Sequence, residues 1–186
     1  MEIIEIVLIS LGVAADAFAV AICKGLSLTH INIKKCIIVG LWFGFFQFFM
    51  PLIGFYFGIS FKNFLSSIDH WVAFFLLLFI GINMIKNYDE EEKEDSSLSI
   101  KNMLVLAIAT SIDALTIGIV YYYGYGVVRH MLTFISVGII TFILSSLGCF
   151  IGHYFENNLG KKSKIIGGII LIYLGFRILL SHLNIL

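Results

Sequence analysis

The chain has 186 residues, of which 60% are hydrophobic and 13% are charged, and its formal net charge is zero. Globular domains use about 45–50% apolar residues, so a mean hydropathy of +1.01 excludes a soluble domain of this size. The sequence holds no basic patch with interleaved aromatic rings, and we therefore expect no nucleic-acid partner. The one hydrophilic insert, 86–101, is too short to bury a core, so residues 1–186 are predicted to form a single membrane domain.

Six segments are apolar over about the 20 residues that a helix needs to cross a bilayer. Helices are expected because backbone polar groups inside a bilayer must be satisfied within the segment itself. The second segment contains Pro51, which favours a kink there. The predicted fold class is an all-α polytopic membrane protein with six transmembrane helices, at 3–23, 36–58, 70–87, 102–123, 130–152 and 164–182.

Lysine and arginine residues are distributed unequally between the two sides of these spans. Nine lie in the odd-numbered connections, namely Lys24, Lys34, Lys35, Lys86, Lys93, Lys101, Lys161, Lys162 and Lys164. Three lie on the other side, namely Lys62, Arg129 and Arg177. By the positive-inside rule, the odd-numbered connections face the cytoplasm and both termini face outward.

Two aspartates, Asp16 and Asp113, lie in the middle of predicted spans. A carboxylate at the centre of a membrane helix costs at least roughly 2.5–3.5 kcal/mol on insertion scales, so such a residue indicates a functional site. Gly12, Asp16, Ala19 and Cys23 share one face of the first span, and this face is narrow because its residues are small. We therefore expect Asp16 to face protein or a wet cavity rather than lipid.

The two halves of the chain resemble each other. Repeat 1 covers about 3–87, an acidic cytoplasmic linker about 88–100, and repeat 2 about 101–182. Each half has three spans, so the second half enters the membrane from the opposite face, which predicts a 3+3 inverted repeat with a site near its interface. The matching pairs are Asp16 with Asp113 at an offset of 97 residues, and Gly54 with Gly148, Gly58 with Gly152 and Gly81 with Gly175 at an offset of 94.

Two carboxylates that meet between the halves would suit a hard divalent cation such as Mg²⁺, Ca²⁺ or Mn²⁺, which prefers oxygen ligands. Their two charges would neutralise the ion, and an exchange of the cation for protons would then be natural. The alternative for both aspartates is a structural hydrogen bond or a buried protonated acid. Asp16 and Asp113 are thus the predicted metal ligands, and possible supporting residues of the ion path are Gln47, Asn83, Thr110, Ser111, Thr116 and Thr141.

Each supporting residue also has a structural interpretation. Threonine and serine in membrane helices commonly donate to a carbonyl of their own helix, which applies to Thr110 and Thr116. Gln47 matches Thr141 in the repeat, and an interhelical hydrogen bond is a sufficient reason for a buried glutamine. Asn83, near the cytoplasmic end, is interpretable as an interfacial residue. Its repeat mate Arg177 breaks the symmetry and is expected to extend toward the outer interface.

With these residues in hand, nearly the whole chain resembles the manganese efflux pump family MntP, within the lysine-exporter type of superfamily. The resemblance implies Mn²⁺ export across the bacterial plasma membrane, with both aspartates essential and with Mn²⁺ as substrate rather than resident cofactor. Some family members carry Glu where Gln47 stands, so this chain lacks that charge. The motifs that carry the resemblance are Asp16-Ala17-Phe18-Ala19, Lys24-Gly25, Pro51-Leu52-Ile53-Gly54, His70-Trp71-Val72-Ala73-Phe74, Ala107-Ile108-Ala109-Thr110-Ser111-Ile112-Asp113-Ala114, Gly160-Lys161-Lys162 and Gly167-Gly168.

Two other classes of function remain open at this point. A non-transporting membrane protein of a related sporulation-associated branch would have the same spans. An intramembrane aspartyl protease would also use two membrane aspartates, but its Gly-x-Gly-Asp signature is absent, since Thr110-Ser111-Ile112 precedes Asp113.

Overall fold

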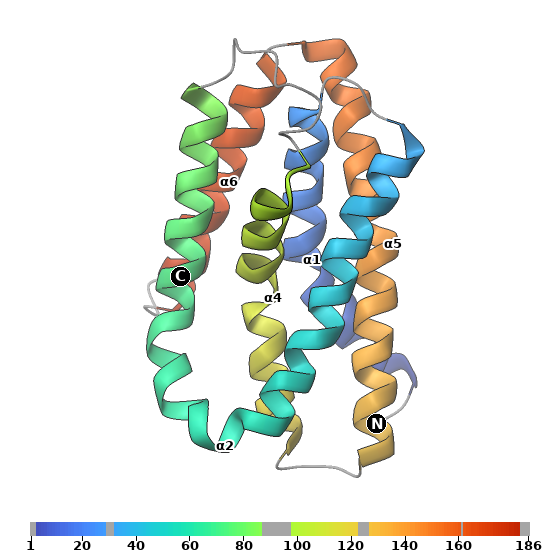
Figure 1. Cartoon of the computed structure of the whole chain (residues 1–186), viewed down its shortest axis with the longest axis vertical. Coiled ribbons are helices and arrows are strands. Elements are labelled where there is room, and N and C mark those ends of the chain that lie inside the picture. Colours follow the sequence, from blue (N-terminus) through green and yellow to red (C-terminus); the bar gives the residue numbers. More distant parts are fainter. Residues whose placement is uncertain (1–2, 29–31, 87–97, 123–126, 161, 183–186) are drawn as a thin grey trace.

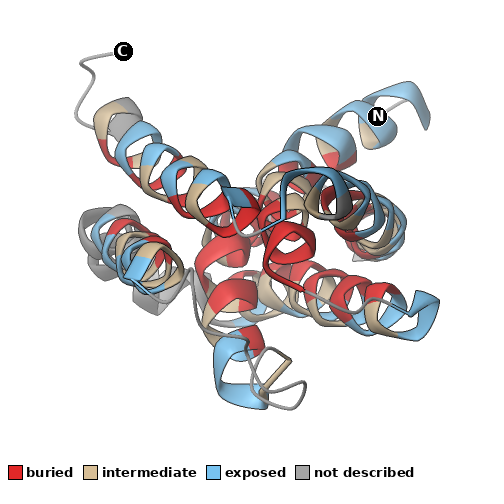
Figure 2. Cartoon of the chain, turned by 90° about the horizontal axis from the view of Figure 1, so that it is seen from above, coloured by how far each residue is buried: buried red, intermediate tan, exposed pale blue. Residues whose placement is uncertain are grey.

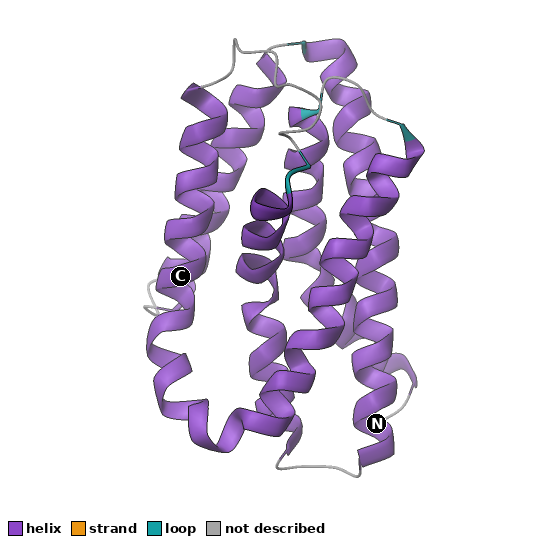
Figure 3. Ribbon diagram, viewed as in Figure 1, coloured by secondary structure: helices purple, strands orange, loops and turns teal. Residues whose placement is uncertain are grey.

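The computed structural model describes residues 3–28, 32–86, 98–122, 127–160 and 162–182, with no account of the side chains at 57–70, 72, 122, 127–129, 157 and 181–182. All regular structure in these ranges is helical (Figure 3). The helices are α1 (Ile3–Ser27), α2 (Ile33–Lys86), α4 (Ile100–Tyr122), α5 (Val127–Leu159) and α6 (Lys162–His182). The all-α class predicted from the sequence is therefore confirmed.

Helix α2 is one continuous element of 54 residues, and a straight helix of that length would measure about 80 Å. Figure 1 shows that α2 instead bends back on itself. Its first limb, Ile33–Tyr56, is long and apolar enough to span a bilayer, and the described part of its second limb, Ala73–Lys86, is a shorter apolar helix. Four further helical segments meet the length and composition of a span, so five of the six predicted spans correspond to helices long and apolar enough to cross a membrane.

The helix ends gather at two ends of the bundle (Figure 1). We call one of them the lysine-rich end: it holds the end of α1, both outer ends of α2, and the starts of α4 and α6. The bend of α2, the end of α4 and the start of α5 lie at the opposite end. The described lysines of the lysine-rich end are Lys24, Lys34, Lys35, Lys86, Lys101, Lys162 and Lys164.

Helices of different halves pack against each other. The most extensive contacts join α1 to α5 and α2 to α4, with α2 also packed on α5 and α6. Buried residues gather at the centre of the bundle and exposed ones face outward (Figure 2). Many of the exposed residues are large and apolar, such as Phe45, Phe79 and Ile139, which is the surface expected of a protein whose solvent is lipid.

Glycines permit the closest approaches. A Cβ atom on Gly118 of α4 would collide with the carbonyl oxygen of Pro51, and one on Gly152 of α5 would collide with the carbonyl oxygen of Ile22. Small residues at helix interfaces are the usual means of close packing in membranes. At the end of α5, Gly160 takes a φ of 55° and its N–H donates to the carbonyl of Glu156, so it ends the helix before α6 begins.

Candidate cation site

Asp16 and Asp113 lie within the middle turns of α1 and α4, respectively, and the structure brings them together. The Asp16 carboxylate lies close enough to Asp113 for repulsion between the two charges. The Asp16 side chain is half-buried, and the Asp113 side chain is exposed. One Asp113 oxygen, Oδ1, accepts a hydrogen bond of 2.8 Å from the N–H of Ala114, which fixes the carboxylate against its own helix. The two acids predicted from the sequence therefore lie within electrostatic range of each other.

Gln47, on the first limb of α2, connects the two aspartate helices. Its Nε2 donates to the carbonyl oxygen of Thr110 on α4 at 2.8 Å and to that of Val13 on α1 at 3.5 Å. Val13 and Thr110 each precede an aspartate by three residues, one helical turn. The predicted interhelical hydrogen bond of Gln47 is therefore confirmed, and it holds α1 and α4 at the level of the acids.

The side-chain oxygen of the same glutamine has no donor in the described part of the chain. Gln47 is fully buried, and its Oε1 has no hydrogen-bond partner among the described residues. Four residues further along, Pro51 has no N–H, so the main-chain carbonyl of Gln47 loses its helical donor. A buried polar oxygen without a partner costs free energy, and such atoms in a native structure call for an unseen partner such as an ion or water.

Helix α5 carries two buried hydroxyl groups. Thr141 and Ser145 are fully buried, and within the described part of the chain neither Thr141 Oγ1 nor Ser145 Oγ has a hydrogen-bond partner. Thr141 was predicted from its match to Gln47, whereas Ser145 was not predicted. The repeat could have drawn attention to Ser145, since this residue matches Pro51 at the same offset of 94 residues.

The other predicted supporting residues divide into two groups. Thr110 Oγ1 donates to the carbonyls of Leu106 and Ala107, and Ser111 Oγ donates to that of Ala107 at 2.7 Å. Both thus make the own-helix bonds expected of hydroxyls in membrane helices, with their oxygen lone pairs left over. Thr116 is exposed, one turn beyond Asp113 toward the opposite end.

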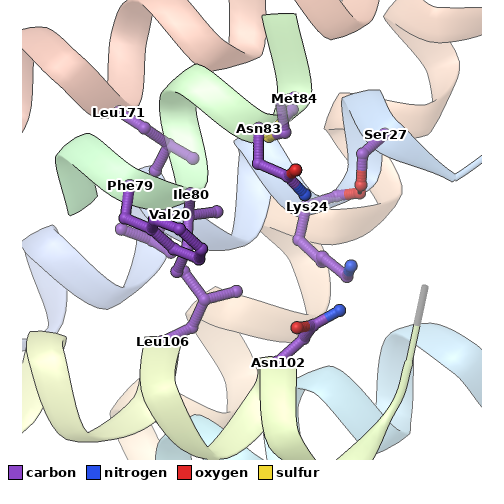
Figure 4. Close-up of a pocket in the computed structure, with 10 residues that line it drawn as sticks. All are labelled: Val20, Lys24, Ser27, Phe79, Ile80, Asn83, Met84, Asn102, Leu106 and Leu171. Atoms are coloured by element: carbon purple, nitrogen blue, oxygen red, sulfur yellow. Dashed lines mark hydrogen bonds between the residues drawn. The ribbon is translucent and has the colours of Figure 1, made fainter. Parts of the chain in front are cut away.

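Asn83 does not join the aspartates. It lines a separate pocket near the lysine-rich end, together with Lys24, Ser27 and Asn102 (Figure 4). Arg177, by contrast, lies close enough to Asp16 to attract its carboxylate. The sequence analysis predicted only that Arg177 extends to the outer interface. The position of Arg177 within the sixth span, where it matches Asn83, could have indicated that it lies near Asp16.

The donor set is rich in oxygen and poor in softer ligands. The described residues contain no group of three or more His, Cys, Asp or Glu side chains that could hold a metal ion. A cation between Asp16 and Asp113 would therefore complete its coordination with neutral oxygens or water. Such a set suits Mg²⁺, Ca²⁺ or Mn²⁺ and does not suit metals that require thiolate or imidazole.

A bundle of apolar helices with two carboxylates at mid-depth defines a multi-pass membrane protein with a charged site inside its spans. The family described as "Putative manganese efflux pump" matches residues 30–179, and the chain belongs to this family. No solved structure is significantly similar to the chain.

Curated relatives match over nearly their full length. A protein of Acetivibrio thermocellus is 46% identical, with 100% of this chain and 94% of the relative covered. A protein of Gloeothece citriformis is 47% identical, covering 99% and 98%, and one of Campylobacter jejuni is 45% identical, covering 98% of each. Each of the three is named "Putative manganese efflux pump MntP".

Proposed function

We propose that this protein exports Mn²⁺ across the plasma membrane and that Asp16 and Asp113 bind the ion together. The observation that carries the proposal is that two acids, 97 residues apart in sequence, lie close enough to repel each other on helices that Gln47 joins. Gln47 is buried, and its Oε1 has no partner among the described residues. The relatives named as manganese efflux pumps supply the metal and the direction of transport.

The chemistry follows from charge. Two carboxylates neutralise a divalent cation, and this neutralisation offsets the cost of removing it from water. Gln47 Oε1 and the hydroxyls of Thr141 and Ser145 supply neutral oxygen atoms at the junction of the halves. When the ion leaves, the two acids repel each other, so we propose that protons replace it and that transport exchanges Mn²⁺ for H⁺.

We further propose that repeat 1 (about 3–87) and repeat 2 (about 101–182) are related by inverted two-fold symmetry. Paired contacts support this relation. Gly54 packs against the carbonyl oxygen of Leu115, and a Cβ atom on Gly148 would lie 2.9 Å from the carbonyl oxygen of Phe18. The repeat offsets convert the first pair into the second, because 54 plus 94 gives 148 and 18 plus 97 gives 115.

The contact between α2 and α5 is consistent with a two-fold axis between Gly44 and Gly138, which are themselves mates. A Cβ on Gly44 would lie 2.8 Å from the Gly138 carbonyl oxygen, and a Cβ on Gly138 would lie 3.1 Å from that of Gly44. Each would also lie 2.8 Å from the Cβ of a phenylalanine, Phe142 for Gly44 and Phe48 for Gly138, and these two are mates as well. Inverted repeats of this kind allow transporters to expose one site alternately to both sides.

The lysine distribution supports an orientation with the lysine-rich end, and with it the acidic linker (about 88–100), in the cytoplasm. Both termini then face outward. Efflux in this orientation means that Mn²⁺ enters from the lysine-rich end and leaves at the opposite end.

Purified protein in proteoliposomes tests the proposal. We expect Mn²⁺ flux that an imposed pH gradient accelerates in one direction and that Asp113→Asn abolishes, while Lys101→Met, a change at the lysine-rich surface, leaves the flux intact. Flux that persists in Asp113→Asn would overturn the assignment of the site. Flux that ignores the pH gradient would remove proton exchange but leave Mn²⁺ transport standing.

A further inference from the structure

The two ends of the aspartate site differ in burial although their residues are repeat mates. Toward the lysine-rich end, Ala109 is 4% exposed and Cys23 is 0% exposed. Their mates toward the opposite end are Gly12, where an added Cβ would meet nothing within 4 Å, and Val120, which is 63% exposed. Asp113 is likewise exposed. The described conformation is thus closed on the lysine-rich side of the aspartates.

The pocket in Figure 4 lies in line with the aspartates on this closed side. On α1, Asp16, Val20, Lys24 and Ser27 follow one another at helical spacing on one face. On α4, Asp113, Thr110, Leu106 and Asn102 do the same in the reverse direction. Five of these residues line the pocket, namely Val20, Lys24, Ser27, Asn102 and Leu106. Any route from the lysine-rich end to the aspartates along these faces therefore passes through this pocket.

The pocket has an apolar floor and a charged side chain above it. Val20, Leu106 and Leu171 are 2%, 3% and 1% exposed, so they separate the pocket from the aspartates with packed apolar groups. Lys24 is only 8% exposed, and its side chain extends across the pocket toward Asn102, while Asn83 points toward Lys24 from the second limb of α2 (Figure 4). An ammonium group in this position repels a divalent cation, because a buried pocket holds little water to screen the two charges.

We propose that Lys24 is the gate of the lysine-rich entrance, an internal cation that determines when a metal ion reaches the aspartates. The inference rests on the proposed function, since it assigns Lys24 a role in access to that site. In the described conformation the Lys24 ammonium occupies the entry pocket in place of the substrate. Opening at this end requires the ammonium to move aside, as Val20 and Leu106 separate.

The test measures access past the gate without measuring transport. Val20→Cys places a thiol of nearly the same size directly below Lys24, in purified protein in detergent, where both ends meet solvent. Its rate of modification is compared for a cationic and an anionic methanethiosulfonate reagent of similar size. With Lys24 present, we expect the cationic reagent to react more slowly than the anionic one.

Replacing Lys24 by Met or Gln in the Val20→Cys protein should raise the cationic rate at least about tenfold relative to the anionic rate, because one unit charge at close range is removed. Lys24→Arg, which keeps the charge, and Lys101→Met, which removes a lysine from the exposed surface of the same end, should leave the ratio unchanged. An equal rise for both reagents would show only loosened packing and would overturn the gate, as would an unchanged ratio. Because the ratio does not depend on Mn²⁺, failure of the gate is distinguishable from failure of the proposed transport.

Discussion

The two halves of the chain have matching glycine contacts but surround their aspartates differently. Gly54 and Gly148 pack on carbonyls of matching residues, and Gly44 faces its own mate Gly138. Near the acids the matches fail: the mate of Gln47 is Thr141, and Arg177, which attracts the Asp16 carboxylate, is the mate of Asn83 in the separate pocket. These paired glycine contacts are what the proposed repeat predicts, while the polar groups near the aspartates differ. This difference suggests that the packing allows two equivalent conformations of the bundle. The polar residues, by contrast, give the two aspartates different surroundings.

The largest effect is expected from the acids themselves. Asp16→Asn and Asp113→Asn each keep the shape of the side chain but remove a charge, so either one should reduce Mn²⁺ transport by at least about 100-fold, above the 10–100-fold typical of outer-shell partners. Cellular manganese content in a deletion strain complemented with each variant measures the effect, with membrane levels of the protein as control. If either variant restores wild-type manganese content, the two aspartates do not act together.

The matched packing predicts a loss of stability from a single methyl group. A Cβ on Gly54 collides with the Leu115 carbonyl, so Gly54→Ala should cost about 1–3 kcal/mol of unfolding free energy and lower the melting temperature in detergent. Gly12→Ala is the matched control, because a Cβ there meets nothing within 4 Å. Equal melting temperatures for the two variants would contradict the tight contact between α2 and α4.

Gln47 tests how far the asymmetric residues support the ion. Gln47→Ala removes the bond to the Thr110 carbonyl and the Oε1 atom, so we expect transport to fall by about 10-fold, a partial loss typical of supporting groups. Thr141→Val provides the comparison from the other half. Valine has nearly the size of threonine, so this substitution removes only the hydroxyl group. Complete loss in Gln47→Ala, equal to that of the aspartate variants, would place Gln47 among the essential ligands.

Arg177 is expected to have the smallest effect. It attracts the Asp16 carboxylate and is exposed, and exposed pairs contribute about 0.2–1 kcal/mol. Arg177→Met should therefore strengthen Mn²⁺ binding by no more than about fivefold. A higher salt concentration should reduce the difference in Mn²⁺ affinity between this variant and the wild type. Arg177→Lys keeps the charge and should bind as wild type does. Weaker binding in Arg177→Met would show instead that Arg177 positions Asp16 for the ion.

The sequence predicted the helical class and the two acids because apolar runs and membrane charges have large, local free-energy signatures. It could not predict that α2 is a single bent helix or that Arg177 lies near Asp16, since both depend on how distant helices pack. Asn83 illustrates the same limit. Its position in the sequence suggests an interfacial or ion-path residue, whereas the packing of the helices places it in the pocket that Lys24 also lines. Nor could the sequence predict that Gln47 Oε1 has no hydrogen-bond partner among the described residues, because hydrogen-bond satisfaction is a property of the folded bundle.

The most direct test of the central claim is a titration of purified protein with Mn²⁺, in which the six-line paramagnetic resonance signal of the free ion reports the bound fraction. We predict one Mn²⁺ site in the wild-type protein, which Asp16→Asn and Asp113→Asn each remove. Undiminished Mn²⁺ binding in either variant would contradict a site that the two aspartates share.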